Sequence, residues 1–237
     1  MAGAATVEKA LDVLFHLHDA PGALGVSEIA RALGLAKSSC HRLLAALVER
    51  EVVEQDEAGR YRPGLALLAL GLGAQRREPV ARLARPQLEA EAAALGETVF
   101  LVAERGGRLR VLDKCEGSGF LRAAPEVGDV IPEDVTAAGK LYRAEREDPE
   151  AARSLGYTVN RDAWIDGLSV LAVPIWQPGP DGRTVLAAVL ALAAASPRFE
   201  ALGEACVAAR LQAAAEQVSA RLGARSGNER AKTGARR

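Results

Sequence analysis

The order of short apolar segments in the first 64 residues is the feature that most constrains the fold. Residues 7–18 carry apolar side chains at steps of three and four, which is the spacing of one helix face. A Pro-Gly pair at 21–22 ends this segment, and two further helical segments follow, separated by a turn at Gly34. A two-stranded ribbon then covers residues 52–55 and 60–62. Three helices and a ribbon in this order predict a winged helix-turn-helix.

The second and third helices of this module have recognisable ends and faces. Ser27 lies just before an apolar run and can cap the second helix by accepting hydrogen bonds from free backbone N–H groups, and Gly34 supplies its stop. The third helix begins three residues later. Its apolar face, which is expected to pack on the core, consists of Cys40, Leu43, Leu44, Leu47 and Val48.

The opposite face of the third helix is small and polar, which suits a helix that enters the major groove of DNA. Ser38 and Ser39 can hydrogen-bond phosphates or base edges, and Arg42 can donate two parallel hydrogen bonds to a guanine or a phosphate. Lys37 lies at the helix start, where free N–H groups also favour phosphate. His41 lies at the margin of this face, and it either contacts the groove or packs on the module.

Charge is distributed unevenly within the module. Residues 1–64 contain seven basic and nine acidic side chains, a net charge of −2, whereas a DNA-binding domain usually has a basic face. Four of the basic residues nevertheless fall on the third helix or the ribbon: Lys37, Arg42, Arg60 and Arg62. We therefore expect Arg60 and Arg62 to contact DNA from the wing. An ordinary solvated helix is the alternative that these residues alone leave open.

The rest of the chain predicts a linker helix and a larger second module. Residues 65–75 are apolar and helical, and their leucines would be exposed in an isolated chain, so we expect a partner to cover them. Beyond Pro79, helices are expected over 80–95 and 199–222 and from Thr136 onward. Strands are expected over 99–104, 109–112, 168–176 and 184–192.

The predicted fold class is therefore α+β: an N-terminal winged helix-turn-helix, a linker helix, and an antiparallel sheet with flanking helices. The expected domains are 1–64 for the DNA-binding module, 65–78 for the linker, 79–224 for the second module and 225–237 for a disordered basic tail.

Composition and motifs exclude several other classes of protein. A chain that is 49% hydrophobic and 26% charged is neither disordered nor collagen-like. The longest apolar run, residues 185–195, is too short to span a bilayer. Three isolated cysteines indicate neither a disulfide framework nor a zinc site, so we expect a cytoplasmic protein without metal or cofactor. The chain has no nucleophile and base at a recognisable spacing, and we do not expect an enzyme.

The first module resembles the N-terminal domain of IclR-family transcriptional regulators. The segments that carry the resemblance are 6–14, 27–30, 34–44 and 59–64, which include the serine pair, a His-Arg-Leu-Leu run and the Tyr-Arg-Pro-Gly end of the wing. Ala36 departs from the family, which usually has a capping Ser or Thr there. That loss costs on the order of 1 kcal/mol unless Ser38 takes over as cap and shortens the helix. The resemblance implies a bacterial repressor that binds a palindromic operator in double-stranded DNA as a homodimer or homotetramer.

The resemblance continues to about Phe199 and implies a GAF-like domain that binds a small organic acid. The effector-binding positions that it implies are Thr136, Ala137, Ala138, Asn160, Val170, Ala191 and Ala193. In the family, backbone N–H groups at the positions of Ala137 and Ala138 hold the negative end of the ligand, as helix N-termini do for anions in general.

Several of these positions depart from the family, and each change removes a polar partner. Asn160 replaces a frequent Asp, Val170 stands where some members have Cys, and Ala191 and Ala193 replace two serines. An apolar or aromatic acid is therefore expected, because a hydrophilic acid such as glyoxylate would leave oxygens unpaired at a cost of about 1–3 kcal/mol per group. The segment 141–155 is also much shorter than in relatives, so the effector site is expected to be open or absent.

Three alternatives remain open from the sequence. The second module serves only for oligomerisation, or the helix-turn-helix of a small-molecule sensor contacts protein instead of DNA, or the second module is an enzyme. Trp164 and Trp176 either line a ligand cavity or pack in the core or against a second subunit. Salt-dependent binding to random duplex DNA separates a regulator from a sensor, because phosphate contacts release counterions.

Overall fold

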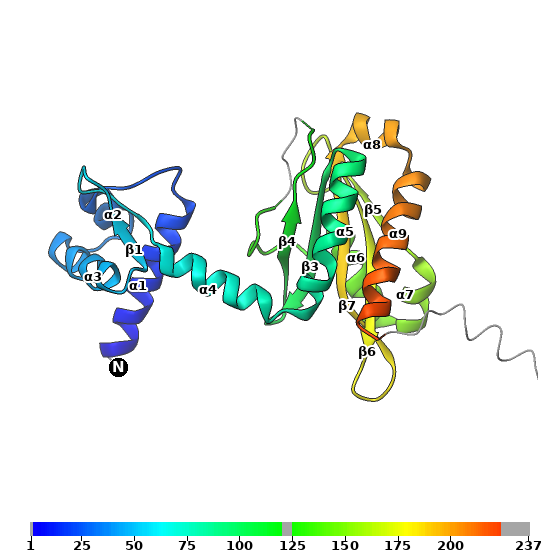
Figure 1. The fold of residues 1–237 in the computed structure, drawn as a ribbon, viewed down its shortest axis with the longest axis horizontal. Coiled ribbons are helices and arrows are strands. Elements are labelled where there is room, and N and C mark those ends of the chain that lie inside the picture. The colour runs from blue at the N-terminus through cyan, green and yellow to red at the C-terminus, as the bar shows by residue number, and fades with distance from the viewer. Residues whose placement is uncertain (1, 120–124, 224–237) are drawn as a thin grey trace, which may run out of the picture. The chain divides into compact units, whose positions relative to one another are not determined.

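The computed structural model of the chain describes residues 2–119 and 125–223, which form two compact units (Figure 1). The first unit ends at Arg77 and the second begins at Glu78, so the helix expected as a separate linker groups with the first unit. The basic tail predicted for residues 225–237 lies outside the described residues.

The first unit contains three helices, a two-stranded ribbon and a further helix. In chain order these are α1 (Ala2–Asp19), α2 (Val26–Ala32), α3 (Lys37–Glu49), β1 (Val53–Gln55), β2 (Tyr61–Pro63) and α4 (Leu65–Arg76). Its core includes Leu17, Ile29, Leu44 and Tyr61. The backbone of Tyr61 also exchanges two hydrogen bonds with Leu24, at 2.8 and 2.9 Å, so the ribbon is tied to the loop before α2.

The start of α2 differs from the sequence prediction. Gly25 is the N-cap residue, and the carboxylate of Glu28 accepts a hydrogen bond from the Gly25 N–H at 2.6 Å. Ser27 lies inside the first turn, so its predicted capping role is wrong. The glutamate reaches back over the turn and satisfies the N-cap, which leaves no role for the serine hydroxyl.

The second unit is built on a five-stranded antiparallel sheet with the order β4-β3-β7-β6-β5. Its strands are β3 (Thr98–Arg105), β4 (Arg108–Cys115), β5 (Thr158–Arg161), β6 (Leu168–Pro178) and β7 (Thr184–Ala195). Its helices are α5 (Pro79–Leu95), α6 (Ala137–Glu147), α7 (Pro149–Leu155), α8 (Ser196–Leu202) and α9 (Glu204–Arg221).

Helices cover both faces of this sheet (Figure 1). On one face α5 and α9 pack over Leu101, Leu171 and Leu190, which are fully buried. On the other face α6 packs over a smaller cluster that includes Phe100 and Val189. Because both faces are covered, β3, β6 and β7 are apolar along most of their length. Among the described residues, no helix combines the length and the apolar character needed to cross a bilayer.

Three features of the second unit differ from the sequence prediction, and the first is the strand β5, which was not expected. The single C-terminal helix expected over 199–222 is interrupted, because Gly203 adopts a φ of 81° and separates α8 from α9. The short segment 141–155 also contains a second helix, α7, that was not predicted. Asp148 caps α7 by accepting hydrogen bonds from the N–H groups of Glu150 and Ala151 at 3.0 and 3.1 Å.

Candidate DNA-binding surface and ligand cavity

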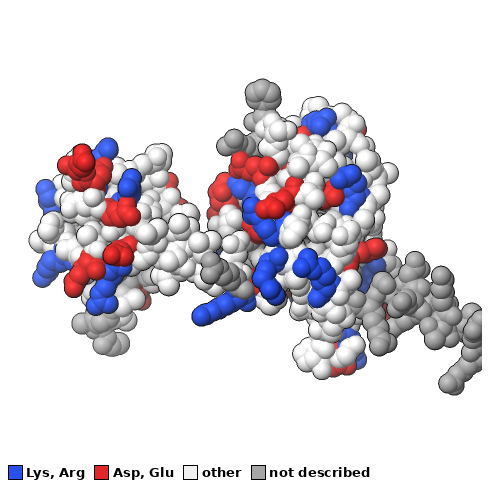
Figure 2. All heavy atoms as spheres, viewed as in Figure 1, with Lys and Arg blue, Asp and Glu red and all other residues white. Residues whose placement is uncertain are grey.

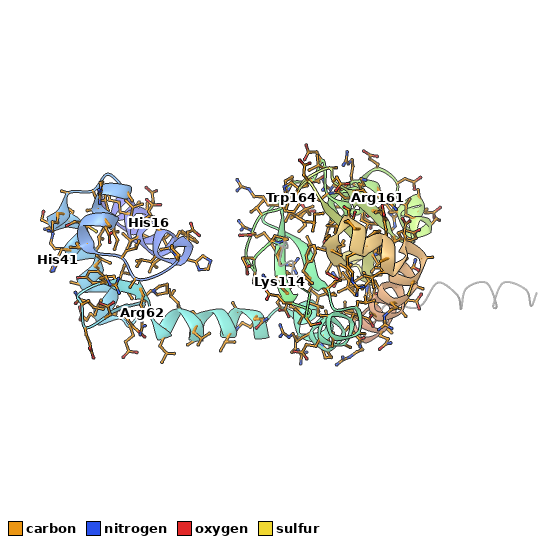
Figure 3. All side chains as sticks on the ribbon, turned by 90° about the horizontal axis from the view of Figure 1, so that it is seen from above. His16, His41, Arg62, Lys114, Arg161 and Trp164 are labelled. Atoms are coloured by element: carbon orange, nitrogen blue, oxygen red, sulfur yellow. The ribbon has the colours of Figure 1, made fainter. Side chains whose placement is uncertain are left out.

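Helix α3 is held on the first unit by one face and turns the other to solvent. Cys40 and Leu44 are fully buried in the core. The opposite face exposes four of the predicted DNA-binding residues, Lys37, Ser38, His41 and Arg42, and Ser39 is half-buried beside them. Figure 3 shows His41 at the outer edge of the unit. The exposed Ala45 and Ala46 add no bulk that would keep the helix away from a duplex.

The polar groups on this face have no competing partners. Within residues 2–119 and 125–223, no side chain forms a hydrogen bond or ion pair with Lys37, Ser38, His41 or Arg42. Ala36 is the N-cap and provides no side-chain cap, and the helix starts at Lys37, so Ser38 does not take over as cap. The first N–H groups of α3 are therefore open to an external acceptor such as a phosphate.

The two arginines of the wing differ from Arg42, because each is paired with a carboxylate. Arg62 lies 3.0 Å from Glu54, and Arg60 lies 3.2 Å from Asp56. Both guanidinium groups are more than half exposed. On the face of the first unit that Figure 2 presents, acidic and basic side chains alternate and form no large basic patch.

The second unit contains a cavity between the start of α6 and the sheet. All seven predicted effector residues line it: Thr136, Ala137, Ala138, Asn160, Val170, Ala191 and Ala193. The cavity covers about 340 Å³ including its open mouth, but its walls lie so close that the interior has room for about one water molecule. The short segment 141–155 therefore does not remove the cavity.

Further lining residues were not predicted from the sequence. They are Phe100, Pro125, Ile131, Trp164 and Leu168, and of these only Trp164 had been considered as a ligand contact. Phe100 and Leu168 come from strands buried on both faces, where residue pattern does not show which face a side chain occupies, and the other three residues lie in connecting segments. The aromatic rings and the alanines of β7 make the walls largely apolar.

Polar groups in this wall are few, and several of them are already hydrogen-bonded within the chain. The Thr136 hydroxyl donates to the Pro132 carbonyl oxygen at 2.6 Å and accepts from the Gly139 N–H at 3.1 Å. The backbone N–H groups of Ala137 and Ala138 have no acceptor among the described residues. The buried Asn160 accepts a hydrogen bond from the Ala163 N–H at 3.1 Å through Oδ1.

No described residue accepts a hydrogen bond from the Asn160 amide nitrogen. Two backbone N–H groups and one side-chain amide of the lining residues are therefore without an acceptor among the described residues, at the N-terminus of a helix whose dipole favours negative charge. The described residues also contain no cluster of three or more side chains that could hold a metal ion.

Comparisons with known proteins agree with this architecture. Residues 6–57 match the family model of the IclR helix-turn-helix domain. The chain is 28% identical over 217 residues to the HTH-type transcriptional repressor AllR of Escherichia coli, which covers 79% of each chain. It is 32% identical over 155 residues to the HTH-type transcriptional regulator TtgV of Pseudomonas putida, which covers 65% of this chain and 59% of TtgV. Residues 6–57 thus match an IclR helix-turn-helix domain, and most of the chain is similar to regulators of the IclR family.

Solved structures of IclR proteins share the fold of the chain. Thermotoga maritima IclR superposes with a TM-score of 0.76 at 24% identity, over 92% of this chain and 99% of that one. An IclR homologue from Microbacterium hydrocarbonoxydans in complex with 4-hydroxybenzoate superposes with a TM-score of 0.72 at 20% identity, over 92% and 98%. The predicted fold class is confirmed, and the helix-turn-helix match together with relatives named as transcriptional regulators supports a DNA-binding transcriptional regulator rather than an enzyme.

Proposed function

We propose that this IclR-family chain is a cytoplasmic repressor that binds a palindromic operator through α3 and responds to a small apolar or aromatic acid. The observation that carries the proposal is the solvent-facing side of α3, on which Lys37, Ser38, His41 and Arg42 have no partner among the described residues. A helix held by a buried face, with small polar residues and one guanidinium on the other, suits the major groove.

Each residue of this face has a distinct proposed role. Arg42 donates to a guanine or a phosphate, because its planar group fits both acceptors. Ser38 and Ser39 position the helix by hydrogen bonds, and Lys37 binds phosphate beside the open N–H groups at the helix start. His41 lies beside Arg42 and contacts the edge of the groove. The wing adds Arg60 and Arg62 as contacts to the phosphate backbone.

An exposed apolar stripe supports assembly as a homodimer or a homotetramer. On α1, Val7, Leu11 and Phe15 follow one another at steps of four and are 59, 47 and 64% exposed. Helix α4 exposes leucines that include Leu65 and Leu70, at 65 and 66%. Large apolar side chains at regular helical spacing indicate a surface that is covered by a partner. A second copy would place two recognition helices on the two half-sites of a palindrome.

The cavity of the second unit is the proposed effector site. A carboxylate would accept hydrogen bonds from the Ala137 and Ala138 N–H groups and from the Asn160 amide, and an aromatic ring would contact Phe100 and Trp164. The solved relative from Microbacterium hydrocarbonoxydans holds 4-hydroxybenzoate, an acid of this chemical class, which supports the proposal. A ligand of that size must move the walls apart.

The experiment that tests DNA recognition is selection and sequencing of fragments of the source genome bound by the protein, followed by gel shift on the enriched site. Arg42→Ala is expected to lose operator affinity. Arg50→Ala is the matched control, because it removes the same charge from the C-cap of α3, away from the helix start. Unchanged affinity in Arg42→Ala would contradict the proposed surface.

Calorimetric titration with benzoate-class and aliphatic acids tests the effector site. Heat of binding from an apolar or aromatic acid at millimolar concentration or below is expected. Absence of binding by any of these acids would favour the alternative in which the second unit serves only for oligomerisation.

A further inference from the structure

The wing carries more acidic than basic groups, although it is a proposed DNA contact. Residues 53–63, which we call the wing, contain Glu54, Asp56 and Glu57 against Arg60 and Arg62. On its own this segment would be repelled by a phosphate backbone. The recognition face of α3 is different, since none of the described ion pairs includes Lys37 or Arg42.

Glu54 lies where it can restrain Arg62 directly. The two residues are register partners on adjacent strands, so their side chains leave the same face of the ribbon. Both Nε and Nη2 of Arg62 donate to the same carboxylate oxygen of Glu54, at 3.1 and 3.0 Å. One edge of the Arg62 guanidinium, with two of its five N–H donors, is thus already directed at a carboxylate.

The pair is also exposed enough to exchange. The side chains of Arg62 and Glu54 are 60 and 41% exposed, and ion pairs in this environment are weak. The neighbouring pair of Arg60 and Asp56 is different, because Asp56 also accepts a hydrogen bond from the Arg60 N–H at 2.8 Å and so shapes the turn. Glu54 has no such backbone role among the described residues.

We propose that Glu54 is a positioning residue that withholds Arg62 from phosphates and so limits the affinity of the protein for DNA that lacks the operator. This inference rests on the proposed DNA-binding function. It assigns the phosphate attraction of the free protein mainly to α3. Arg62 of the wing engages DNA only when it leaves the Glu54 carboxylate.

A double-mutant cycle on the full chain tests this inference. Glu54→Gln, Arg62→Ala and the double variant are titrated with a mixed-sequence DNA duplex over a range of salt concentrations. Glu54→Gln is expected to raise affinity about threefold to fivefold at 0.15 M salt and to steepen the salt dependence by up to about 0.9 in log–log slope, the value of one added phosphate contact. Arg62→Ala is expected to change affinity less than twofold alone, and to remove the whole gain in the Glu54→Gln background.

Glu57→Gln is the matched control, since it removes an equal charge from the wing without releasing an arginine. Its salt slope is expected to equal that of the unaltered protein. Equal slopes for Glu54→Gln and Glu57→Gln, or a gain that survives Arg62→Ala, would overturn the inference. Thermal unfolding of each variant checks that the exposed substitutions leave the fold intact. An unaltered protein that binds no duplex at any salt concentration would instead overturn the proposed function, and the inference with it.

Discussion

On α3, four polar or charged side chains face solvent without partners, whereas in the cavity of the second unit two backbone N–H groups and one amide face a narrow apolar space. The first arrangement costs little to build, because water satisfies the exposed groups until DNA replaces it. The second has a cost for stability, since buried donors without acceptors in the chain destabilise a fold. On α3, DNA affinity can therefore change without a change in the stability of the first unit. Around the cavity, ligand affinity and the stability of the second unit change together. Four substitutions test this difference.

The largest expected effect is on the stability of the cavity wall. A Cβ atom at Gly139, in the first turn of α6, would lie 1.9 Å from the carbonyl oxygen of Glu133. Gly139→Ala is therefore expected to lower the free energy of unfolding of the second unit by about 3 kcal/mol. Urea unfolding followed by tryptophan fluorescence measures this, because Trp164 and Trp176 both lie in that unit.

Gly71→Ala is the control for this substitution, since nothing in the chain lies within 4 Å of the added atom. Circular dichroism is expected to show that this variant is at least as stable as the unaltered protein, because alanine is the better helix former. If Gly139→Ala left the stability unchanged, the backbone around Glu133 would have to move away from the added methyl group at little cost. The cavity wall would then not be rigid.

On α3 the opposite result is expected, a loss of binding without loss of stability. Arg42→Ala should weaken operator binding by about 1–3 kcal/mol, because one forked donor to a base or phosphate is removed. Its melting temperature should stay unchanged, since Arg42 has no partner among the described residues. Gel shift and thermal unfolding on the same preparation measure both quantities. A clear fall in the melting temperature of Arg42→Ala would contradict the separation of DNA binding from stability on α3.

Inside the cavity, a small substitution is expected to change ligand preference. Ala193→Ser restores a hydroxyl at a position that lines the cavity, and one added hydrogen bond contributes about 1 kcal/mol. Affinity for glyoxylate should rise about fivefold and affinity for benzoate should fall, as measured by calorimetry. Ala45→Ser adds the same hydroxyl to the exposed face of α3 and should leave acid binding unaltered. Parallel changes in both variants would argue against the assigned cavity.

The smallest expected effect is the acid sensitivity of the second unit. The Tyr157 hydroxyl donates to the Glu204 carboxylate at 2.8 Å, and with the adjacent Arg161 it lowers the pKa of Glu204. Because the folded-state pKa lies below the ordinary value, the stabilisation is fully present above that value and is lost as pH falls through the folded-state pKa. Glu204→Gln should therefore show a smaller drop in melting temperature between neutral and acidic pH.

Glu49→Gln on α3 is the control for this pH series, since no described ion pair includes Glu49. Its melting temperature should follow the same pH dependence as that of the unaltered protein. A pH profile flattened equally by both substitutions would mean that general charge, and not the contact of Glu204 with Tyr157, sets the acid sensitivity.

The helices of the first unit could be predicted from residue spacing, because each has one apolar face and clear breaks. The cavity could not, since β3 is buried on both faces and its periodicity does not separate Phe100, which lines the cavity, from Leu101, which faces α5 and α9. Its predicted residues came from the resemblance to the IclR family. The break at Gly203 was missed, because a glycine within a helical pattern is compatible with a continuous helix until its φ is known.

The ion pairs of the wing are a second feature that could not be predicted from the sequence. Arg60 and Arg62 were predicted as DNA contacts from their charge and position, but their carboxylate partners depend on strand register and turn geometry. The pairing of Glu54 with Arg62 becomes visible only when the ribbon is folded. The roles of these residues toward DNA stay predictions until the double-mutant cycle is measured.

The narrowness of the cavity has a consequence for the proposed response to an acid. An acid that enters must first displace packed side chains, and the free energy of that displacement weakens its apparent affinity. The displaced arrangement is then stabilised only while the acid is present, so occupied and empty proteins differ in conformation by necessity. A wider cavity would bind the acid more tightly, but binding would change the conformation of the second unit less. A narrow cavity binds the acid more weakly, and binding changes the conformation more.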